Sequence, residues 1–454
     1  MINPLYIPEI REMLAGHDVA GLKEFCEALH PARTADFMEG LTPDEAWEVL
    51  SHTDHERRLE VFHYFDEDAQ VAILEALSRA DAAALVSELA HDDRVDILNE
   101  VEPDVVTEVL SLLPTEERRD ILHLQSYPEG TAGAVMTTDV AKFGESMTVR
   151  EALDRIQQIA SELETIYYLY IVDEQDHLRG LVSARQMLSS IGKPDLHLGE
   201  LMETGLVTAE VDDDQEEVAQ KVARFDLAAI PVVDEERTMM GIITYDDIFD
   251  VVQEEATEDA HRSAAVQPLE ETYLKTSLLT LVWKRGIWLT ILFVAALLTC
   301  LALQRYEDDL QAWKWLILFV PLVISSGGNT GNQSATLVIR DLATDELGLG
   351  DWGRVAIREL VTGLLLGSFL AVCGLVAACA ITPEARNAWA IWVLPSTLLA
   401  VVVCGSTVGA MLPLFFKKLG LDPALMSNPF VAVIIDVVGI MVYMNVAILL
   451  LPPV

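Results

Sequence analysis

The sequence predicts a multidomain membrane protein with a soluble N-terminal part and an all-α transmembrane domain of five helices. Three observations support this fold class: an even helical repeat over the first 125 residues, a longer strand-and-helix repeat over residues 133–252, and five apolar segments after residue 280. The predicted order is an N-terminal α-solenoid of short helix pairs (1–130), tandem α/β domains (133–195 and 196–252), an acidic connecting helix (246–275) and the five-helix transmembrane domain (280–454).

The first domain is a helical repeat. Segments of similar sequence begin at Leu41, Phe65, Leu89 and Leu113, an even step of 24 residues, and a second helical segment lies half a step before them. A pair of short helices cannot bury its apolar face alone, so neighbouring pairs must stack. The repeat therefore predicts a small α-solenoid and says little about function.

Negative charge is concentrated in the N-terminal part. The formal net charge is −42, yet the chain from Ala265 onward holds 11 Lys and Arg against 13 Asp and Glu, so the part before Ala265 holds the other 19 basic and 59 acidic side chains. Such a surface repels phosphate backbones, and no nucleic-acid partner is expected. It is either a solubilising surface or a binder of small cations. The five cysteines show no CxxC spacing, which fits a reduced, cytosol-facing compartment.

The second repeat combines strands and helices. Residues 168–183 match residues 229–244, because in both copies two β-branched runs flank a charged turn and a helix begins after Ser183 or Thr244, either of which can cap it. The pattern resembles a tandem pair of CBS domains. Such pairs often bind adenosine nucleotides, so the resemblance makes Thr244 and Asp247 candidate contacts to the ribose and phosphates of ATP. A purely structural or dimerising pair is the alternative.

The segment after the second α/β domain is predicted to be an acidic helix. Its carboxylates recur at spacings of three or four residues and so share one face: Asp247, Asp250, Glu254 and Glu258. Like charges at this spacing weaken a helix unless something positive lies between them. Either this face is simply solvated, or a divalent cation bridges it to another acidic surface.

Five segments are expected to cross a membrane as helices. They cover residues 286–304, 313–338, 360–381, 388–415 and 427–452. Eight Lys and Arg residues flank the ends on the side of the soluble domains and three flank the opposite ends, so the positive-inside rule predicts cytoplasmic soluble domains and a C-terminus outside. The second span is polar and glycine-rich over residues 321–335, which is typical of a pore or helix-packing element.

One carboxylate, Asp436, lies near the middle of the fifth span. Inserting a charge there costs roughly 3 kcal/mol or more, so such a residue rarely faces lipid. It faces a water-filled path, pairs with a cation, or lies protonated against a neighbouring helix. The first two alternatives, taken together, are favoured over the third.

With these features the chain resembles the MgtE family of magnesium channels over its whole length and in its domain order. The sharpest motifs are Gly327-Gly-Asn-Thr-Gly-Asn-Gln-Ser-Ala-Thr336 and Asp422-Pro-Ala-Leu-Met-Ser-Asn428-Pro, with Asp436 downstream. The resemblance implies a multi-pass Mg²⁺ channel of a bacterial-type inner membrane rather than an enzyme. It further implies a homodimer with one pore on its two-fold axis, lined by the second and fifth spans. Cytosolic Mg²⁺ would bind between the acidic domains, hold the connecting (plug) helix against the pore and close it.

The resemblance also implies sets of metal-binding residues. Mg²⁺ usually keeps several waters, so a hydrated ion between two Asp436 carboxylates is expected, with the carbonyls of Ala432 and Gly439 accepting hydrogen bonds from those waters. Asn428 would lie at the inner mouth near Asp422. The regulatory set is assigned by position: Asp92, Asp96, Asp214, Glu216, Asp226, Asp247, Asp250, Glu255, Glu258 and Asp259.

Other functions remain open at this point. Gly348-Leu-Gly-Asp351 matches the GxGD string of intramembrane aspartyl proteases, but Asp351 falls in a polar loop. Chloride channels that carry CBS domains have many more spans. A CBS-gated regulator without conduction is a further alternative, and so is transport of Co²⁺, Mn²⁺ or Ca²⁺, because hard oxygen ligands serve all of these ions to some degree.

Overall fold

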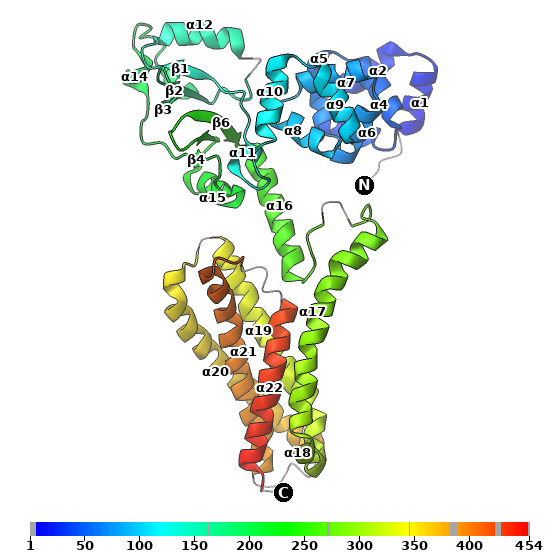
Figure 1. The fold of residues 1–454 in the computed structure, drawn as a ribbon, viewed down its shortest axis with the longest axis vertical. Helices are drawn as coiled ribbons and strands as arrows, with labels where there is room; N and C mark the ends of the chain where they lie inside the picture. Colours follow the sequence, from blue (N-terminus) through cyan, green and yellow to red (C-terminus); the bar gives the residue numbers. More distant parts are fainter. Residues whose placement is uncertain are drawn as a thin grey trace. The chain divides into compact units, whose positions relative to one another are not determined.

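The computed structural model describes residues 6–160, 163–269, 273–344, 346–381, 389–422 and 428–452. The chain divides into two compact units, an N-terminal unit (Met1–Val252) and a C-terminal unit (Gln253–Val454). Figure 1 shows that short helices and small sheets make up the first, whereas long helices make up the second.

Short helices begin the N-terminal unit. They are α1 (Ile7–Ala15), α2 (Val19–Ala28), α3 (Pro31–Met38), α4 (Pro43–Ser51), α5 (His55–His63), α6 (Glu67–Ala76), α7 (Arg79–Glu88), α8 (His91–Glu100), α9 (Pro103–Leu112) and α10 (Thr115–Leu124). Four successive helices start on a side-chain cap that accepts a backbone N–H three residues later: Thr42, Asp54, Asp66 and Ser78. These four caps are separated by half of the sequence repeat, whereas α8, α9 and α10 begin without a side-chain cap.

These helices pack in two rows. In one row α4, α6, α8 and α10 contact each other in succession, and in the other α3 contacts α5 and α7 contacts α9. Leu50, Phe62, Leu74 and Val86, which also follow one another at half-repeat steps, are fully buried in one shared core. This is the stacking that the sequence repeat predicts, because each helix hides its apolar stripe only against its neighbours.

Two three-stranded sheets of the same topology follow. The first contains β1 (Lys142–Gly144), β2 (Tyr168–Val172) and β3 (Leu178–Ser183), and the second β4 (Ala209–Glu210), β5 (Ala229–Val233) and β6 (Met239–Thr244). In each sheet the first pair is parallel and the second antiparallel. The accompanying helices are α11 (Ala132–Val135), α12 (Val149–Ile159), α13 (Ala184–Ser189), α14 (Leu198–Leu201) and α15 (Gln215–Phe225). The equivalence of the two sheets accounts for the second sequence repeat.

The two sheets form one block. The Leu178 N–H donates to the Arg237 carbonyl, and the Met239 N–H donates to the Asp176 carbonyl, both at 2.9 Å. Side chains from both sheets, Tyr170 among them, share one buried cluster. The tandem pair is therefore joined by backbone hydrogen bonds as well as by apolar packing.

The connecting helix, α16 (Tyr245–Ser263), begins directly after β6. Its first part belongs to the N-terminal unit and its second part, from Gln253, to the C-terminal unit. The helix ends earlier than the segment 246–275 expected from the sequence, with Ala265 in a left-handed conformation at φ 57°. Pro268 follows, and a proline would interrupt any continuation of α16, because it has no backbone N–H and clashes with the preceding turn.

Long helices dominate the C-terminal unit. Its elements are α17 (Leu278–Arg305), α18 (Glu307–Ala312), η1 (Lys314–Phe319), α19 (Val320–Ala343), η2 (Leu349–Asp351), α20 (Trp352–Ile381), η4 (Ala390–Trp392), α21 (Val393–Lys418) and α22 (Asn428–Leu450). Over the described ranges, four helical stretches are long and apolar enough to cross a membrane: Leu278–Arg305, Leu349–Ile381, Ala390–Lys418 and Asn428–Leu450. The second of the five expected spans corresponds to α19, which is not among these four because its sequence is rich in Gly, Ser and Asn.

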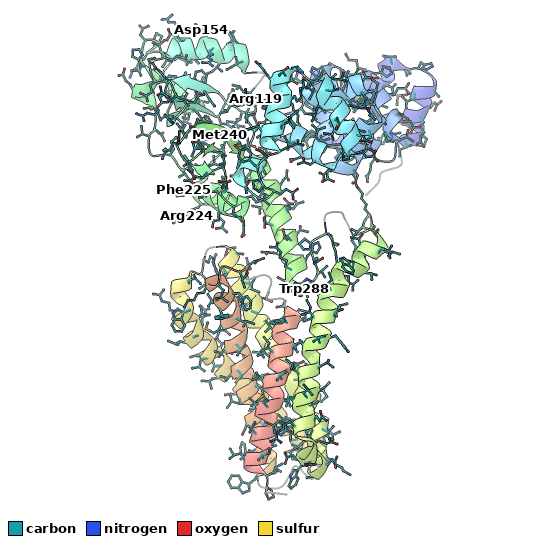
Figure 2. The ribbon with its side chains drawn as sticks, viewed as in Figure 1. Arg119, Asp154, Arg224, Phe225, Met240 and Trp288 are labelled. Atoms are coloured by element: carbon teal, nitrogen blue, oxygen red, sulfur yellow. The ribbon has the colours of Figure 1, made fainter. Side chains whose placement is uncertain are left out.

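The helix α21 is the packing centre of this unit, since α19, α20 and α22 all contact it. Gly405 and Gly409 of α21 lie directly against Gly327 and Gly331 of α19. Glycines at four-residue spacing let two helix backbones approach closely. By contrast, the most apolar window of α17 has no buried residue within this single chain, and Figure 2 shows side chains, Trp288 among them, projecting from that helix.

Candidate functional site

The Asp436 carboxylate of α22 lies beside a glycine, Gly328, of α19. A Cβ placed on Gly328 of α19 would lie 3.7 Å from the Asp436 Oδ1 atom and 3.7 Å from the Ala432 Cβ atom of α22. Asp436 is half-buried, and no other described residue forms a hydrogen bond or an ion pair with its carboxylate. The arrangement leaves the Asp436 oxygens available to the waters of a hydrated cation.

Two of the predicted residues share a helix face with Asp436. Ala432 lies four residues before it and Gly439 three residues after it, so the three follow one another along one face of α22. Gly439 is buried, and a Cβ at this position would lie 3.6 Å from Val401 Cγ1 of α21. Ala432 and Asp436 both lie against Gly328 of α19, whereas Gly439 lies against α21.

Asn428 stands at the start of α22, about 12 Å along the helix axis from Asp436. Its Oδ1 atom accepts a hydrogen bond of 3.2 Å from the Thr336 hydroxyl of α19. The two polar motifs of the sequence are thus connected directly, one end of the glycine-rich segment to the Asn428-Pro pair. Residues 423–427, between Asp422 and Asn428, lie outside the described part of the chain.

Asp422 belongs to a charged group with the second half of α16. The Arg262 guanidinium donates to Asp422 Oδ2 at 2.7 Å and also contacts the Glu258 carboxylate. Burial raises the pKa of Asp259, and the nearby Asp422 carboxylate raises it further while Arg262 opposes the shift. Glu255 also contributes to this raised pKa. Arg262 therefore joins Glu258 to Asp422, and Asp259 lies close enough to Asp422 for the two carboxylates to interact.

A second acidic group lies inside the N-terminal unit, where α8 approaches the start of α16. Asp92 is only 9% exposed, and its Oδ1 atom is buried without a hydrogen-bond partner in the described structure. Burial raises the pKa of Asp92 well above its usual range, and the carboxylates of Asp247, Asp93 and Glu164 raise it further. Burial together with Asp247 and Asp93 raises the pKa of Glu164 to about 7. These four carboxylates repel one another unless a proton or a cation separates them.

Asp250 lies near the same group. The His63 ring contacts Asp93 with Nδ1 at 3.4 Å from Oδ2. This hydrogen bond raises the pKa of His63, and the carboxylates of Asp93 and Asp250 raise it further. Glu164 and Asp93 were missed by sequence reasoning. Glu164 lies between α12 and β2 with no motif around it, so only the tertiary fold brings it to Asp92.

Asp96, predicted to act with Asp92, does not share its environment, because Asp92 is buried and Asp96 is exposed. Arg94 between them is itself buried, and its guanidinium donates to the Leu89 and Ser87 carbonyls at 2.7 and 2.8 Å. Arg94 thus holds the turn between α7 and α8, and only its long-range charge acts on Asp92.

The three predicted residues of the second α/β domain are not brought together within one chain. Asp214 is the N-cap of α15 and accepts the Glu216 N–H at 2.9 Å. Asp226 ends the same helix in a left-handed conformation at φ 51°. Asp214 and Glu216 are therefore about 16 Å from Asp226 along the axis of an 11-residue helix.

The tandem α/β pair contains a pocket of about 830 Å³. Thr244, Asp226 and Asp246 belong to its wall, and so do the exposed aromatic residues Tyr167 and Tyr245. Asp247 is not part of the wall. Its carboxylate instead accepts hydrogen bonds from the Thr244 backbone N–H at 3.2 Å and from the Thr244 hydroxyl at 2.5 Å, so it supports the start of α16. The volume and the aromatic wall suit a nucleotide.

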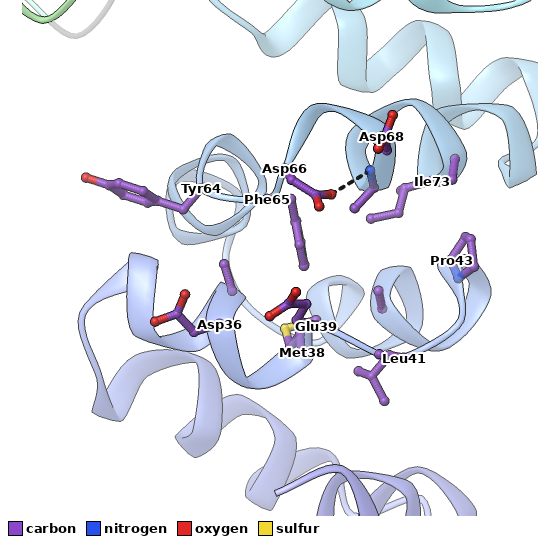
Figure 3. A pocket seen from close by; sticks show the side chains of 15 residues that line it. Asp36, Met38, Glu39, Leu41, Pro43, Tyr64, Phe65, Asp66, Asp68 and Ile73 are labelled. Atoms are coloured by element: carbon purple, nitrogen blue, oxygen red, sulfur yellow. Dashed lines mark hydrogen bonds between the residues drawn. The ribbon is translucent and has the colours of Figure 1, made fainter. Parts of the chain in front are cut away.

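Another pocket, of about 520 Å³, opens among the short helices (Figure 3). Four carboxylates belong to its wall: Asp36, Glu39, Asp66 and Asp68. Asp66 caps α6 by accepting the Ala69 N–H at 2.9 Å, which Figure 3 marks with a dashed line. This pocket shows how far the acidic surface extends over the helical repeat.

Across the described ranges, no three His, Cys, Asp or Glu side chains are arranged to hold a metal ion within the single chain. The acidic residues approach one another in pairs and clusters instead. The structure thus supplies oxygen donors of the kind that Mg²⁺ prefers without assembling a complete coordination sphere.

Comparison with known families accounts for most of the chain. Residues 320–446 match the MgtE family, described as a divalent cation transporter. Residues 29–130 match the MgtE intracellular N domain, and residues 132–193 and 198–254 each match the CBS domain.

Characterised relatives agree with these matches. A magnesium transporter MgtE from Thermus thermophilus is 41% identical over 75% of this chain and 74% of its own. One from Enterococcus faecalis is 32% identical over 73% of this chain and 72% of its own.

Solved structures resemble the N-terminal part. The cytosolic domain of the Mg²⁺ channel MgtE in complex with ATP is 33% identical, with a TM-score of 0.50 over 53% of this chain and 98% of that structure. The soluble part of a magnesium transporter is 31% identical, with a TM-score of 0.51 over 55% of this chain and 97% of that structure. The chain therefore belongs to the MgtE family of magnesium transporters, which are not enzymes.

Proposed function

We propose that this protein is a homodimeric Mg²⁺ channel whose single pore lies on the two-fold axis, lined by α19 and α22 of both subunits. The observation that supports this pore is the pairing of Asp436 with Gly328, a carboxylate in an apolar helix beside an open backbone surface. A charge at this position in a membrane helix requires either water or a cation. Two such carboxylates facing each other across a symmetry axis would line a water-filled path and hold a hydrated cation between them.

The ion is expected to pass in hydrated form. Mg²⁺ gives up its waters reluctantly, so few direct protein ligands are needed. The Asp436 carboxylates accept hydrogen bonds from the waters of the ion, and the carbonyls of Ala432 and Gly439 extend the acceptor row along α22. Asn428, held by Thr336, would line the inner mouth together with Asp422.

Regulation by cytosolic Mg²⁺ is the second part of the proposal. The part of the chain before Ala265 carries a net charge of −40, so the acidic domains of a dimer repel one another and α16 is released when cations are scarce. The carboxylates of Asp247 and Glu164 influence Asp92 electrostatically, and the buried Asp92 Oδ1 atom lacks a partner in the described structure. These donors fit a hard divalent cation, which would supply positive charge and draw α16 toward the closed state.

The remaining regulatory residues are proposed to bind cations together with groups of a second subunit. They are Asp96, Asp214, Glu216, Asp226, Asp250, Glu255, Glu258 and Asp259. Several weak sites acting together give a steeper response than one site, because each cation shifts the same two-state equilibrium.

The pocket of the tandem α/β pair is proposed to bind ATP. Its volume of about 830 Å³ and its exposed tyrosines support this, as does the ATP complex of a related cytosolic domain. The soluble domains are proposed to face the cytoplasm and the C-terminus the outside, in accord with the positive-inside rule. Transport of another divalent cation, or regulation without conduction, is the alternative.

Flux measurements test the pore. Wild-type and Asp436→Ala proteins are reconstituted into liposomes, and Mg²⁺ uptake is followed while the Mg²⁺ concentration on the side of the soluble domains is varied. Asp436→Ala is expected to abolish uptake. Asp351→Ala is the matched control, because Asp351 ends η2, directly before α20, and pairs with the exposed Arg354. Wild-type uptake by Asp436→Ala would place the pore elsewhere.

The same liposomes test the gate and the ion. Replacing Asp247 and Asp250 with Asn is expected to make uptake less sensitive to Mg²⁺ on the side of the soluble domains. Unchanged sensitivity would remove α16 from the regulatory mechanism. Competition by Co²⁺, Mn²⁺ and Ca²⁺ separates a Mg²⁺ channel from a transporter of another ion.

A further inference from the structure

Three hydroxyl residues of α19 stand at steps of four along one face: Ser326, Thr330 and Ser334. The first two donate to their own helix, Ser326 to the Leu322 carbonyl at 2.7 Å and Thr330 to the Ser326 carbonyl at 2.8 Å. This is the usual use of a hydroxyl in a long helix. Ser334 departs from the series, because its hydroxyl donates to another helix.

The acceptor is the carboxylate of Glu359 on α20, with 2.6 Å between Ser334 Oγ and Glu359 Oε2. Ser334 is only 6% exposed. The Glu359 carboxylate thus gives this hydroxyl an acceptor outside its own helix. No basic side chain in the described part of the chain forms an ion pair with Glu359, and its carboxylate accepts the Ser334 hydroxyl instead.

The backbone of Glu359 is also held. Its carbonyl accepts a hydrogen bond of 3.1 Å from the hydroxyl of Ser406, a fully buried residue of α21. Glu359 therefore connects three helices, with its side chain on α19 and its main chain on α21. A carboxylate at this place has a structural use that does not require contact with an ion.

The opposite side of α19 is held by the second polar bond, from Thr336 to Asn428 of α22. Ser334 and Thr336 are two residues apart, so they point to nearly opposite sides of the helix at about 100° per residue. Bonds on two sides oppose rotation of α19 about its axis. Gly328, six residues earlier on the same rigid helix, keeps its place beside Asp436 only if that rotation is fixed.

We infer that Glu359 is a positioning residue of the ion pathway, which sets the rotation of α19 by accepting the Ser334 hydroxyl. The inference rests on the proposed pore, since it assigns Glu359 the task of keeping Gly328 opposite Asp436. Glu359 acts through hydrogen-bond acceptance and not through its charge. This distinguishes it from a carboxylate that attracts cations to the inner mouth.

The test uses full-length protein in liposomes, with uptake normalised to the amount of folded protein. Glu359→Leu removes the acceptor, Ser334→Ala removes the donor, and Glu359→Gln keeps an acceptor oxygen without the charge. Each of the first two variants is expected to lower Mg²⁺ uptake by up to roughly tenfold, the change expected for loss of one hydrogen bond. The double variant Glu359→Leu with Ser334→Ala is expected to be no worse than either single variant. Glu359→Gln is expected to stay close to wild type.

The ratio of Mg²⁺ to Ca²⁺ uptake provides the readout that simple stabilisation would not move. A rotated α19 changes the surroundings of Asp436 and hence this ratio, whereas a less stable protein only lowers the number of working channels. Ser368→Ala is the matched control, because Ser368 of α20 donates to its own helix at the Leu364 carbonyl.

The inference is overturned if Glu359→Gln is as impaired as Glu359→Leu, or if the ratio stays at the wild-type value in every variant. Failure of the pore itself is seen separately, because Asp436→Ala would then conduct normally in the same assay. Loss of uptake in Asp436→Ala together with wild-type behaviour of Glu359→Leu rejects the role of Glu359 alone.

Discussion

Gly405 of α21 lies so close to Gly327 of α19 that a Cβ at position 405 would stand 2.6 Å from the Gly327 carbonyl oxygen. Real Cβ atoms do not approach a backbone oxygen so closely, and the obstacle is main chain rather than a flexible side chain. The distance between α19 and α21 is therefore set by two missing side chains, and Gly409 and Gly331 repeat the contact one turn later.

Gly405→Ala is expected to destabilise the C-terminal unit, because the added methyl group forces two packed helices apart. Overpacking of this kind costs about 1–3 kcal/mol. Thermal unfolding of the full chain in detergent measures the effect. Gly353→Ala is the control, since a Cβ at position 353 of α20 meets nothing within 4 Å. Equal melting temperatures for the two variants would contradict the contact.

Arg94→Met is expected to destabilise the helical repeat. The buried guanidinium donates to the Leu89 and Ser87 carbonyls, and its removal leaves two acceptors without a donor, at a cost of about 1–3 kcal/mol each if they stay dry. Denaturant unfolding followed by circular dichroism gives the difference. Arg119→Met on α10 is the comparison, because Arg119 is exposed (Figure 2). If both variants unfold at the same denaturant concentration, the Arg94 bonds contribute nothing.

Stability of the N-terminal unit is expected to fall between pH 5 and pH 8 in the absence of divalent cations. The pKa of Glu164 is raised from 4.5 to about 7 by burial and by the carboxylates of Asp247 and Asp93. The folded chain therefore holds a proton that the unfolded chain has released. The stability that this protonated carboxyl contributes is present below pH 4.5 and lost as the pH rises through 7.

Glu164→Gln is expected to remove part of this pH dependence, about 1–2 kcal/mol once solvent screening of the partly exposed side chain is allowed for. Unfolding midpoints at pH 5 and pH 8, with a chelator present, measure the change. Glu174→Gln, in the exposed turn after β2, should leave the pH dependence as in wild type. The same pH dependence in Glu164→Gln and wild type would show that Glu164 does not sense the neighbouring carboxylates.

Tyr167→Ala is expected to weaken ATP binding by roughly tenfold, the loss of about 1–2 kcal/mol that removal of a stacking partner for a base produces. Tyr167 is 63% exposed and belongs to the wall of the 830 Å³ pocket. Isothermal titration of the full-length protein gives the affinity. Tyr273→Ala serves as the control, because Tyr273 is similarly exposed, at 66%, and is not part of that wall. Identical affinities would remove Tyr167 from the nucleotide site.

The repeats were the part of the fold that sequence could predict well. Buried apolar residues recur at half-repeat steps, and such periodicity determines which faces are buried before any tertiary contact is known. The polar character of the segment 321–335 likewise indicated a pore or helix-packing element, and the structure buries Gly327, Gly328 and Gly331.

The candidate site was predictable only where a residue is unusual for its segment. Asp436 stands out because a carboxylate is rare in an apolar helix, and Asn428 belongs to a motif. Glu164 and Glu359 are ordinary residues in their own segments. Their importance comes from Asp92 and Ser334, which lie 72 and 25 positions before Glu164 and Glu359 respectively in the chain, and no local pattern encodes contacts over such separations.

Sequence also could not separate ligands from caps. Asp214 and Asp247 fit an acidic metal-binding pattern, yet both accept backbone N–H groups at helix starts. A carboxylate near the N-terminus of a helix often accepts hydrogen bonds from the free N–H groups there. Helix caps and metal ligands draw on the same acidic residue types, and only the three-dimensional structure shows which hydrogen bonds each residue makes.

The even spacing of the short helices has a consequence for how this domain can vary in length. From α4 to α10 every second helix touches the next in one row, and α3 touches α5 and α7 touches α9 in the other, so insertion or deletion of a piece that contains two helices restores the same neighbours on both sides of the junction. Gain or loss of a single helix would instead swap the rows and expose every buried stripe beyond that point. Length variants of this domain that still fold should therefore differ by whole helix pairs.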